Sequence, residues 1–166
     1  MNAMEVVGVR IEMPSNQPII LLKEVSGVRF LPIWVGAVEA TAIAFAQQGV
    51  QPPRPLTHDL VKIILDTVGA TLEQVVITKV QDGIFFAELV LALENRAELR
   101  ISARPSDAIA IALRTQSSIY ATEEILQAAG IEIPAGDAGS EAQDSNEEVE
   151  RFREFLDQVN PEDFFG

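Results

Sequence analysis

Residues 71–93, TLEQVVITKVQDGIFFAELVLAL, contain two β-rich runs separated by a short polar turn. The runs at 71–80 and 84–93 are rich in β-branched and aromatic residues, which favour strands. Between them stands Gln81-Asp82-Gly83, and Asp-Gly is a preferred sequence for a tight hairpin turn. The stretch therefore predicts an antiparallel hairpin in the middle of the chain.

On both sides of this hairpin the chain mixes further strands with helices. β-Branched runs bounded by turn residues predict more strands at 4–13, 18–25, 28–35, 98–103 and 118–121. Apolar periodicity and capping residues predict helices at 37–48, 58–68, 107–114 and 123–129. Because hairpins and helices are interspersed rather than strictly alternating, we expect an α+β fold: a mixed, largely antiparallel sheet with buried helices packed on it.

The helix ends carry residues that are typical of caps. Thr57, Ser106 and Thr122 each precede a helical run and are expected as N-caps. The helices at 37–48 and 107–114 are small and apolar nearly all round, which is typical of helices that are buried on more than one side.

The 166 residues are enough for one buried core and too few for two ordinary domains. We expect a single α+β domain at residues 1–134 and a flexible, acidic linker at 135–146. Residues 147–166 are expected to form a C-terminal amphipathic helix and tail. The apolar face of this helix would dock on the core or on a partner subunit, and it comprises Val149, Phe152, Phe155, Leu156 and Val159.

Composition narrows the function classes. The chain has no cysteine, which excludes disulfides, thiolate metal sites and a cysteine nucleophile. No apolar run is long enough for a membrane helix and no signal peptide is recognisable, so we expect a soluble, cytoplasmic protein without a membrane partner. The net charge is −13, of which residues 135–166 contribute −8. This charge disfavours strong non-specific binding to duplex DNA, but leaves room for a local basic site formed by Arg54 and Arg104 with Arg100 or Arg114.

Two blocks with related chemistry stand about fifty residues apart: PRPLTHDL at 53–60 and ARPSD at 103–107. Each places an arginine, a proline, a hydroxyl and an aspartate just before a helical run, so the two helix starts could converge on one polar site. Arginine binds phosphate bidentately, and histidine transfers protons near neutral pH. The candidate site residues are His58, Asp59, Asp107 and Glu39 for catalysis, and Arg54 and Arg104 for substrate binding.

Each candidate also has a structural interpretation. His58 could hydrogen-bond a loop carbonyl, and Asp59 could complement the helix dipole. Arg104 and Asp107 could form a pair that fixes the turn into the helix. Glu39, the only charge on its helix, must be paired, protonated or bound to a metal. Pairing with Arg54 or Arg104 is favoured over a Mg²⁺ or Mn²⁺ site with Asp59 and Asp107, because no metal-binding spacing is present.

Three ordered blocks resemble the bifunctional nuclease family: LPIWVG at 31–36 followed by Glu39-Ala40, PRPLTHD at 53–59, and ARPSDAIA at 103–110. The resemblance covers about residues 4–134, and the endings FREFL and PEDF are similar to those of bacterial members. It implies a compact α+β domain that self-associates. It also implies an activity described for plant relatives, which is cleavage of RNA and DNA with little sequence preference.

Two functions from different classes follow. The first is a nuclease-type phosphodiesterase that acts on flexible, single-stranded RNA or DNA, with weak binding of the nucleic acid and an optional divalent cation. The second is a non-catalytic homo-oligomeric binding or regulatory protein, in which the arginines, acids and histidine form a structural network. A homodimer or higher homo-oligomer is expected in both.

Overall fold

The computed structural model describes residues 1–94 and 97–132. In this part of the chain the helices are α1 (Ala37–Gln47), α2 (Thr57–Thr67), α3 (Pro105–Thr115) and α4 (Glu123–Ala129). None of them is long and apolar enough to cross a membrane. The strands are β1 (Asn2–Glu12), β2 (Gln17–Glu24), β3 (Arg29–Trp34), β4 (Ala70–Gln81), β5 (Ile84–Leu93), β6 (Leu99–Ala103), β7 (Ser118–Ala121) and β8 (Ile131–Glu132). The linker and the C-terminal helix predicted at 135–166 lie outside the described residues.

These strands form one mixed sheet in the order β6-β5-β4-β7-β1-β2-β3-β8. Neighbouring strands are antiparallel except β4 and β7, which run parallel. The predicted α+β class and the predicted element order are therefore confirmed. The two-residue strand β8, which pairs with Arg29 and Phe30 of β3, was not predicted.

The central hairpin forms as the sequence predicts. Gln81 pairs with Ile84, so the loop consists of Asp82 and Gly83 alone. Both residues have positive φ, 52° and 76°, which is the conformation of a type I′ turn. Asp and Gly tolerate this left-handed region better than most residues, and this tolerance fixes the register of β4 and β5.

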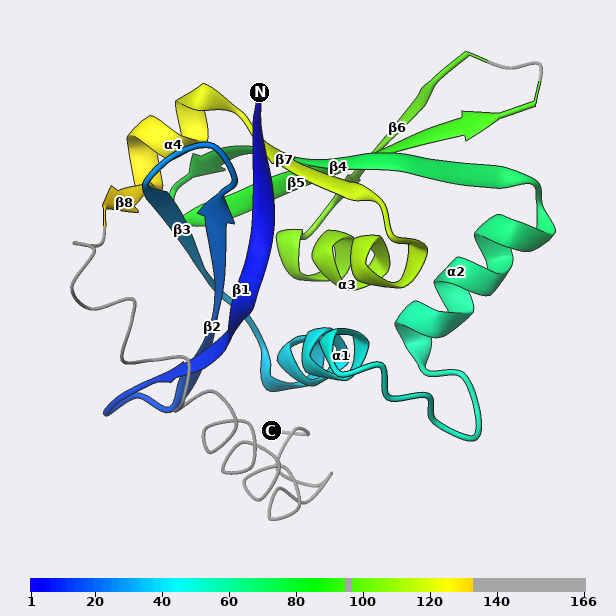
Figure 1. The fold of residues 1–166 in the computed structure, drawn as a ribbon, viewed down its shortest axis with the longest axis horizontal. Coiled ribbons are helices and arrows are strands. Elements are labelled where there is room, and N and C mark those ends of the chain that lie inside the picture. The colour runs from blue at the N-terminus through cyan, green and yellow to red at the C-terminus, as the bar shows by residue number, and fades with distance from the viewer. Residues whose placement is uncertain (95–96, 133–166) are drawn as a thin grey trace.

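Three helices lie on the same side of the sheet, with α3 between α1 and α2 (Figure 1). The alanines of α1 and α3 leave little side-chain volume, so these two helices pack closely against each other and against the sheet. The buried residues of α3 occupy nearly its whole circumference, as predicted, and comprise Pro105, Ser106, Ala108, Ile109, Ala110, Ile111 and Ala112.

Two of the three expected N-caps are wrong. The N-cap of α2 is Leu56 rather than Thr57, because the Asp59 side chain accepts a hydrogen bond from the Leu56 backbone N–H at 2.8 Å. The N-cap of α3 is Arg104 rather than Ser106, because Pro105 favours the first helical position and thereby moves the cap two residues earlier. Thr122 caps α4 as predicted and accepts from the Ile125 N–H.

An arginine-centred cluster joins β2, β3 and α4. Arg29 donates two hydrogen bonds to Glu24 at the end of β2, at 3.0 and 2.8 Å. It donates two more to Glu123 of α4, at 2.8 and 3.1 Å. Gly27 makes this possible, since a Cβ there would lie only 2.0 Å from a Glu24 carboxylate oxygen. We call Glu24, Arg29 and Glu123 the Arg29 cluster.

Candidate functional site

The starts of α2 and α3 meet in space. His58, in the first turn of α2, is 49 residues from Asp107 in the first turn of α3, yet His58 Nε2 lies 2.9 Å from Asp107 Oδ1. The His58 side chain is only 9% exposed. The two blocks noted in the sequence therefore converge, through one contact between a histidine and a carboxylate.

Arg104 extends this contact to α1. Its Nε donates to Asp107 Oδ2 at 2.7 Å and its Nη2 donates to Asp107 Oδ1 at 3.0 Å, a bidentate pair. The same Nη2 donates to Glu39 Oε1 at 2.8 Å. Glu39 thus has a partner, as the favoured interpretation of the sequence required. We call Glu39, His58, Arg104 and Asp107 the Arg104 cluster.

Gly36 gives the Glu39 carboxylate its place. As the N-cap of α1 it lies beside Glu39, and a Cβ built on Gly36 would come 2.4 Å from Glu39 Oε2. Any residue with a Cβ at position 36 would require the Glu39 carboxylate to shift from this position. Gly36 is therefore a residue of the site that the sequence shows only as a helix boundary.

Asp59 belongs to a second pair. Arg114 of α3 donates from Nε to Asp59 Oδ1 at 2.5 Å and from Nη1 to the Ala110 carbonyl at 2.8 Å. The Arg114 side chain is only 8% exposed. The sequence names Arg114 only as a candidate basic residue. Its pairing with Asp59 was missed, because no local pattern links residues 55 positions apart.

Arg54 stands apart from both groups. It is an exposed residue in the loop between α1 and α2, and it makes no hydrogen bond or ion pair with residues 1–94 or 97–132. The six candidates thus divide into the four-residue Arg104 cluster, Asp59 in its own pair, and Arg54 on the surface.

The carboxylates of Asp107 and Asp59 are held in the ionised form. Burial alone would raise the pKa of Asp107, but hydrogen bonds from Arg104 and His58 outweigh burial, so the pKa is lowered. Burial likewise opposes the lowering of the Asp59 pKa by Arg114 and the Leu56 N–H. The pKa of Arg104 is raised by its bond to Asp107 and, against desolvation, by Glu39.

The ionised state of Asp107 decides the tautomer of His58. A carboxylate can only accept hydrogen bonds, so neutral His58 carries its proton on Nε2 and leaves a lone pair on Nδ1. Nδ1 has no hydrogen bond to the described residues, and no fully buried side-chain nitrogen or oxygen in that part of the chain lacks a partner. Nδ1 therefore keeps contact with solvent.

Most carboxylate oxygens of the two groups have a hydrogen-bond partner. Both oxygens of Asp107 and Oε1 of Glu39 accept from Arg104 or His58, and those of Asp59 accept from Arg114 and Leu56. Residues 1–94 and 97–132 contain no group of three histidine or acidic side chains arranged as a metal site.

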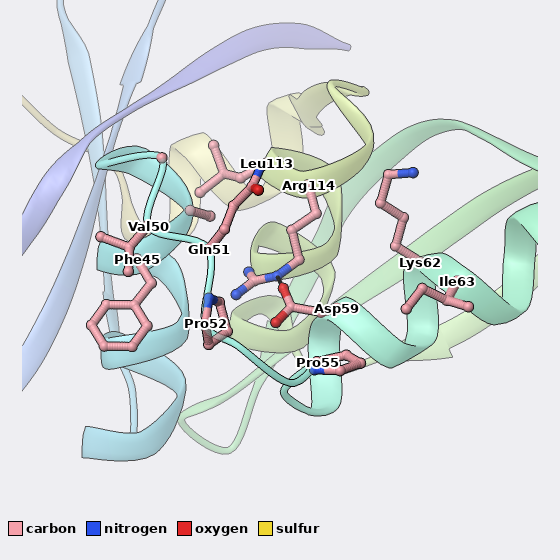
Figure 2. Close-up of a pocket in the computed structure, with 12 residues that line it drawn as sticks. Phe45, Val50, Gln51, Pro52, Pro55, Asp59, Lys62, Ile63, Leu113 and Arg114 are labelled. Carbon is pink, nitrogen blue, oxygen red and sulfur yellow. Dashed lines mark hydrogen bonds and ion pairs between the residues drawn. The ribbon is translucent and has the colours of Figure 1, made fainter.

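A pocket of about 400 Å³ lies beside the Asp59–Arg114 pair. It is bounded by the end of α1, the loop that follows α1, and helices α2 and α3. Figure 2 shows Asp59 and Arg114 pointing toward each other in its centre, with Pro52 and Pro55 of the loop nearby. The pocket is thus lined by Asp59, which directly follows His58 in α2.

Comparisons with known proteins identify a family and several relatives of this chain. The family described as "Bifunctional nuclease domain" matches residues 20–134. An uncharacterized protein of Mycobacterium tuberculosis is 48% identical over 165 residues, which are 99% of this chain and 98% of the relative. Bifunctional nuclease 1 of Arabidopsis thaliana is 32% identical over 119 residues, 70% of this chain and 37% of the relative. Bifunctional nuclease 1 of Oryza sativa subsp. japonica is 28% identical over 120 residues, 71% of this chain and 36% of the relative.

The match to the family spans all the candidate residues, from Glu39 to Asp107, together with Arg114. The plant relatives are much longer than the matched part, since this chain aligns with only about a third of each of them. The sequence resemblance is thus confirmed at the level of the family. The chain belongs to the bifunctional nuclease domain family.

Proposed function

We propose that this chain is a phosphodiesterase that cleaves single-stranded RNA or DNA with little sequence preference. The observation that carries the proposal is the His58–Asp107 pair, in which a partly buried carboxylate orients a buried histidine whose second nitrogen reaches solvent. This is the arrangement of a general base held by an acid. The match with plant bifunctional nucleases supports the type of reaction.

In the proposed reaction, His58 Nδ1 takes a proton from water as the water oxygen attacks phosphorus. The new P–O bond forms as the bond to the leaving oxygen breaks, and that oxygen receives the proton back from His58. Water must be the nucleophile if both RNA and DNA are substrates, because DNA has no 2′-hydroxyl group.

Arg104 and Arg54 are the groups that would bind the phosphate. Arg104 is 66% exposed, and its Nη1 makes no hydrogen bond with the described residues, so it can donate to a phosphate oxygen. Arg54 is exposed on the neighbouring loop. Glu39 and Asp107 hold the Arg104 guanidinium in one orientation, which is how Glu39 contributes to the site.

Purified protein should be assayed on labelled single-stranded RNA and DNA with Mg²⁺, Mn²⁺ or EDTA. We expect cleavage in EDTA and a loss of about 100-fold or more in His58→Ala, the usual size of a general-base effect. The matched control is Asp66→Asn, an exposed residue of α2 whose ion pair within the described residues is with Lys62. Equal cleavage by folded His58→Ala and the unchanged protein would overturn the proposal.

The second candidate is a non-catalytic, homo-oligomeric binding protein. It is favoured by the charge of the Arg104 cluster, where one arginine faces two carboxylates, so that an incoming phosphate must compete with both. In this case the cluster would serve to hold α1, α2 and α3 together. The cleavage assay separates the two candidates.

Self-association is proposed under both candidates. Helix α2 and the residues at its ends expose a row of large apolar side chains at helical spacing, a pattern more typical of subunit interfaces than of a free surface. The row comprises Leu56, Leu60, Ile64 and Val68, each at least 40% exposed. In sedimentation experiments, Ile64→Glu should lower the molecular mass in solution, whereas Val28→Glu, on the exposed β2–β3 turn, should not.

A further inference from the structure

The pocket beside Asp59 contains an arginine with unused hydrogen-bond donors. Arg114 uses Nε and Nη1 within the protein, and its Nη2 makes no hydrogen bond with the described residues. The side chain is 8% exposed, yet in the described chain no fully buried side-chain nitrogen lacks a partner. Nη2 therefore reaches the surface of the pocket, and Figure 2 shows the guanidinium in the pocket centre.

Asp59 gives the same pocket a hydrogen-bond acceptor. Its two oxygens accept from Arg114 and from the Leu56 N–H, but an ionised carboxylate offers about four acceptor positions. Asp59 therefore retains capacity toward the pocket. The Asp59–Arg114 pair has no net charge, and Lys62, which also lines the pocket, is paired with Asp66. An anion placed on Arg114 would therefore also meet the Asp59 carboxylate. A neutral group that both accepts and donates fits better.

The remaining walls are mostly apolar. The volume of about 400 Å³ is within the range of roughly 300–1,000 Å³ that is usual for small-molecule sites. Aromatic and proline rings provide flat surfaces against which a planar group can stack. The apolar lining includes Phe45, Val50, Pro52, Pro55, Ile63 and Leu113.

The pocket is also close to the proposed catalytic pair. Asp59 directly follows His58 in α2, and Arg114 lies two turns after Asp107 in α3, about 10 Å along the helix axis. At roughly 3.4 Å per stacked nucleotide, this separation corresponds to about three nucleotides of a strand. One strand could therefore reach the pocket and the Arg104 cluster together.

We infer that this pocket is a nucleobase-binding subsite for one base of a single-stranded substrate. A base has flat faces for the apolar walls, and an edge with acceptors for Arg114 Nη2 and N–H donors for Asp59. Guanine is the preferred base, because its Watson–Crick edge places the O6 acceptor, for Arg114 Nη2, beside the N1–H and N2–H donors, for Asp59. Selection at a single base leaves the overall sequence preference low. The inference rests on the proposed function and adds a substrate-binding role to it.

The test is an NMR titration of the full-length protein that follows the Arg114 Nε–H and the Phe45 ring. The probes are guanosine 5′-monophosphate, uridine 5′-monophosphate and inorganic phosphate. The blocking variant is Val50→Trp, which fills the pocket from its loop. The matched control is Val28→Trp, at an exposed valine on the β2–β3 turn.

We expect the guanine nucleotide to shift both signals and to bind about tenfold more tightly than the uracil nucleotide. Val50→Trp should weaken this binding at least tenfold, and Val28→Trp should leave it unchanged. Equal shifts with inorganic phosphate would make the pocket an anion site and overturn the inference. Unweakened nucleotide binding by folded Val50→Trp would also overturn it.

Cleavage assays on the same variants separate this inference from the nuclease proposal. If the nuclease proposal alone fails, guanine binding still depends on Val50 while His58→Ala cleaves as well as the unchanged protein. If the subsite alone fails, His58→Ala loses cleavage while Val50→Trp binds nucleotides normally. When both hold, Val50→Trp raises KM for RNA more than it lowers kcat.

Discussion

Arg29 and Arg104 each hold two carboxylates, but they differ in what remains available to a ligand. Arg29 uses Nε, Nη1 and Nη2 in four hydrogen bonds and is 23% exposed. Arg104 is 66% exposed, and its Nη1 makes no bond with the described residues. The Arg104 cluster also includes a histidine, whereas the Arg29 cluster consists of one arginine and two glutamates.

The difference separates a structural ion-pair cluster from a candidate site. At the Arg29 cluster every part of the guanidinium is used to join β2, β3 and α4. At the Arg104 cluster the same kind of pairing leaves one donor group and one histidine nitrogen facing solvent. A residue that combines fixed orientation with unused hydrogen-bonding capacity can act on a substrate.

The largest expected effect is on the cleavage rate, when one carboxylate of each cluster is replaced by an amide. Asp107→Asn should lower the cleavage rate by about 10²- to 10⁴-fold, because an amide can donate to Nε2 and thereby favour the wrong His58 tautomer. Glu24→Gln should leave the rate of the folded protein unchanged. Initial rates on single-stranded RNA, measured well below the Tm of both variants, check this. Equal rate losses in both variants would remove the functional distinction between the clusters.

The next effect concerns nucleic-acid binding by the two arginines. Arg104→Gln should weaken binding to single-stranded DNA by about tenfold. It should also make the slope of log K against log salt less negative by about 0.7, the value for one lost phosphate contact. Arg29→Gln should change neither quantity. Fluorescence anisotropy at several salt concentrations measures both, and identical slopes for the two variants would contradict phosphate binding by Arg104.

For thermal stability we expect the opposite order, with a larger loss at the Arg29 cluster than at the Arg104 cluster. Arg29→Met leaves the buried Glu24 carboxylate without its counter-charge, and a charge left unpaired in a protein interior is strongly unfavourable. We expect Tm to fall by about 5 °C. Arg104→Met should lower Tm by less, because its site is open to water. Thermal unfolding followed by circular dichroism measures both Tm values. A larger fall in Tm for Arg104→Met than for Arg29→Met would contradict the prediction.

The smallest effect is a change in pH dependence at the Arg29 cluster. Hydrogen bonds from Arg29 and Asn2 lower the pKa of Glu123 from 4.5 to about 2. Since the folded state favours the ionised form, the stabilisation is complete above pH 4.5 and is lost as the pH falls toward 2. The difference in Tm between the unchanged protein and Glu123→Gln should therefore shrink over this interval. A difference that is constant between pH 5 and pH 2 would contradict it.

Most of the fold could be predicted from local sequence. The Asp82-Gly83 turn, the strand runs on both sides of it and the alanine-rich helices depend on backbone preferences and periodicity, which are properties of neighbouring residues. Two helix starts were displaced by one or two positions, because Asp59 and Pro105 compete with the capping hydroxyls of Thr57 and Ser106. Strand β8 was not predicted, since two residues carry too little pattern.

The candidate site was predicted as a set of residues but not as an arrangement. The sequence identifies Arg54, His58, Asp59, Arg104, Asp107 and Glu39, because charged and polar residues beside apolar helices are conspicuous. It could not show that Asp59 pairs with Arg114 or that Gly36 makes room for Glu39. Those contacts depend on how α1, α2 and α3 cross.

The sequence by itself determined the elements, their order, the α+β class and the residue types available for chemistry. Only the tertiary structure decided which acid faces which base, which arginine keeps a free donor, and that Arg114 reaches a pocket. The physical reason is the sequence distance over which each interaction acts. Turn and helix preferences act over a few residues, whereas the pairs between α2 and α3 join positions 49 and 55 residues apart and form only when the helices pack.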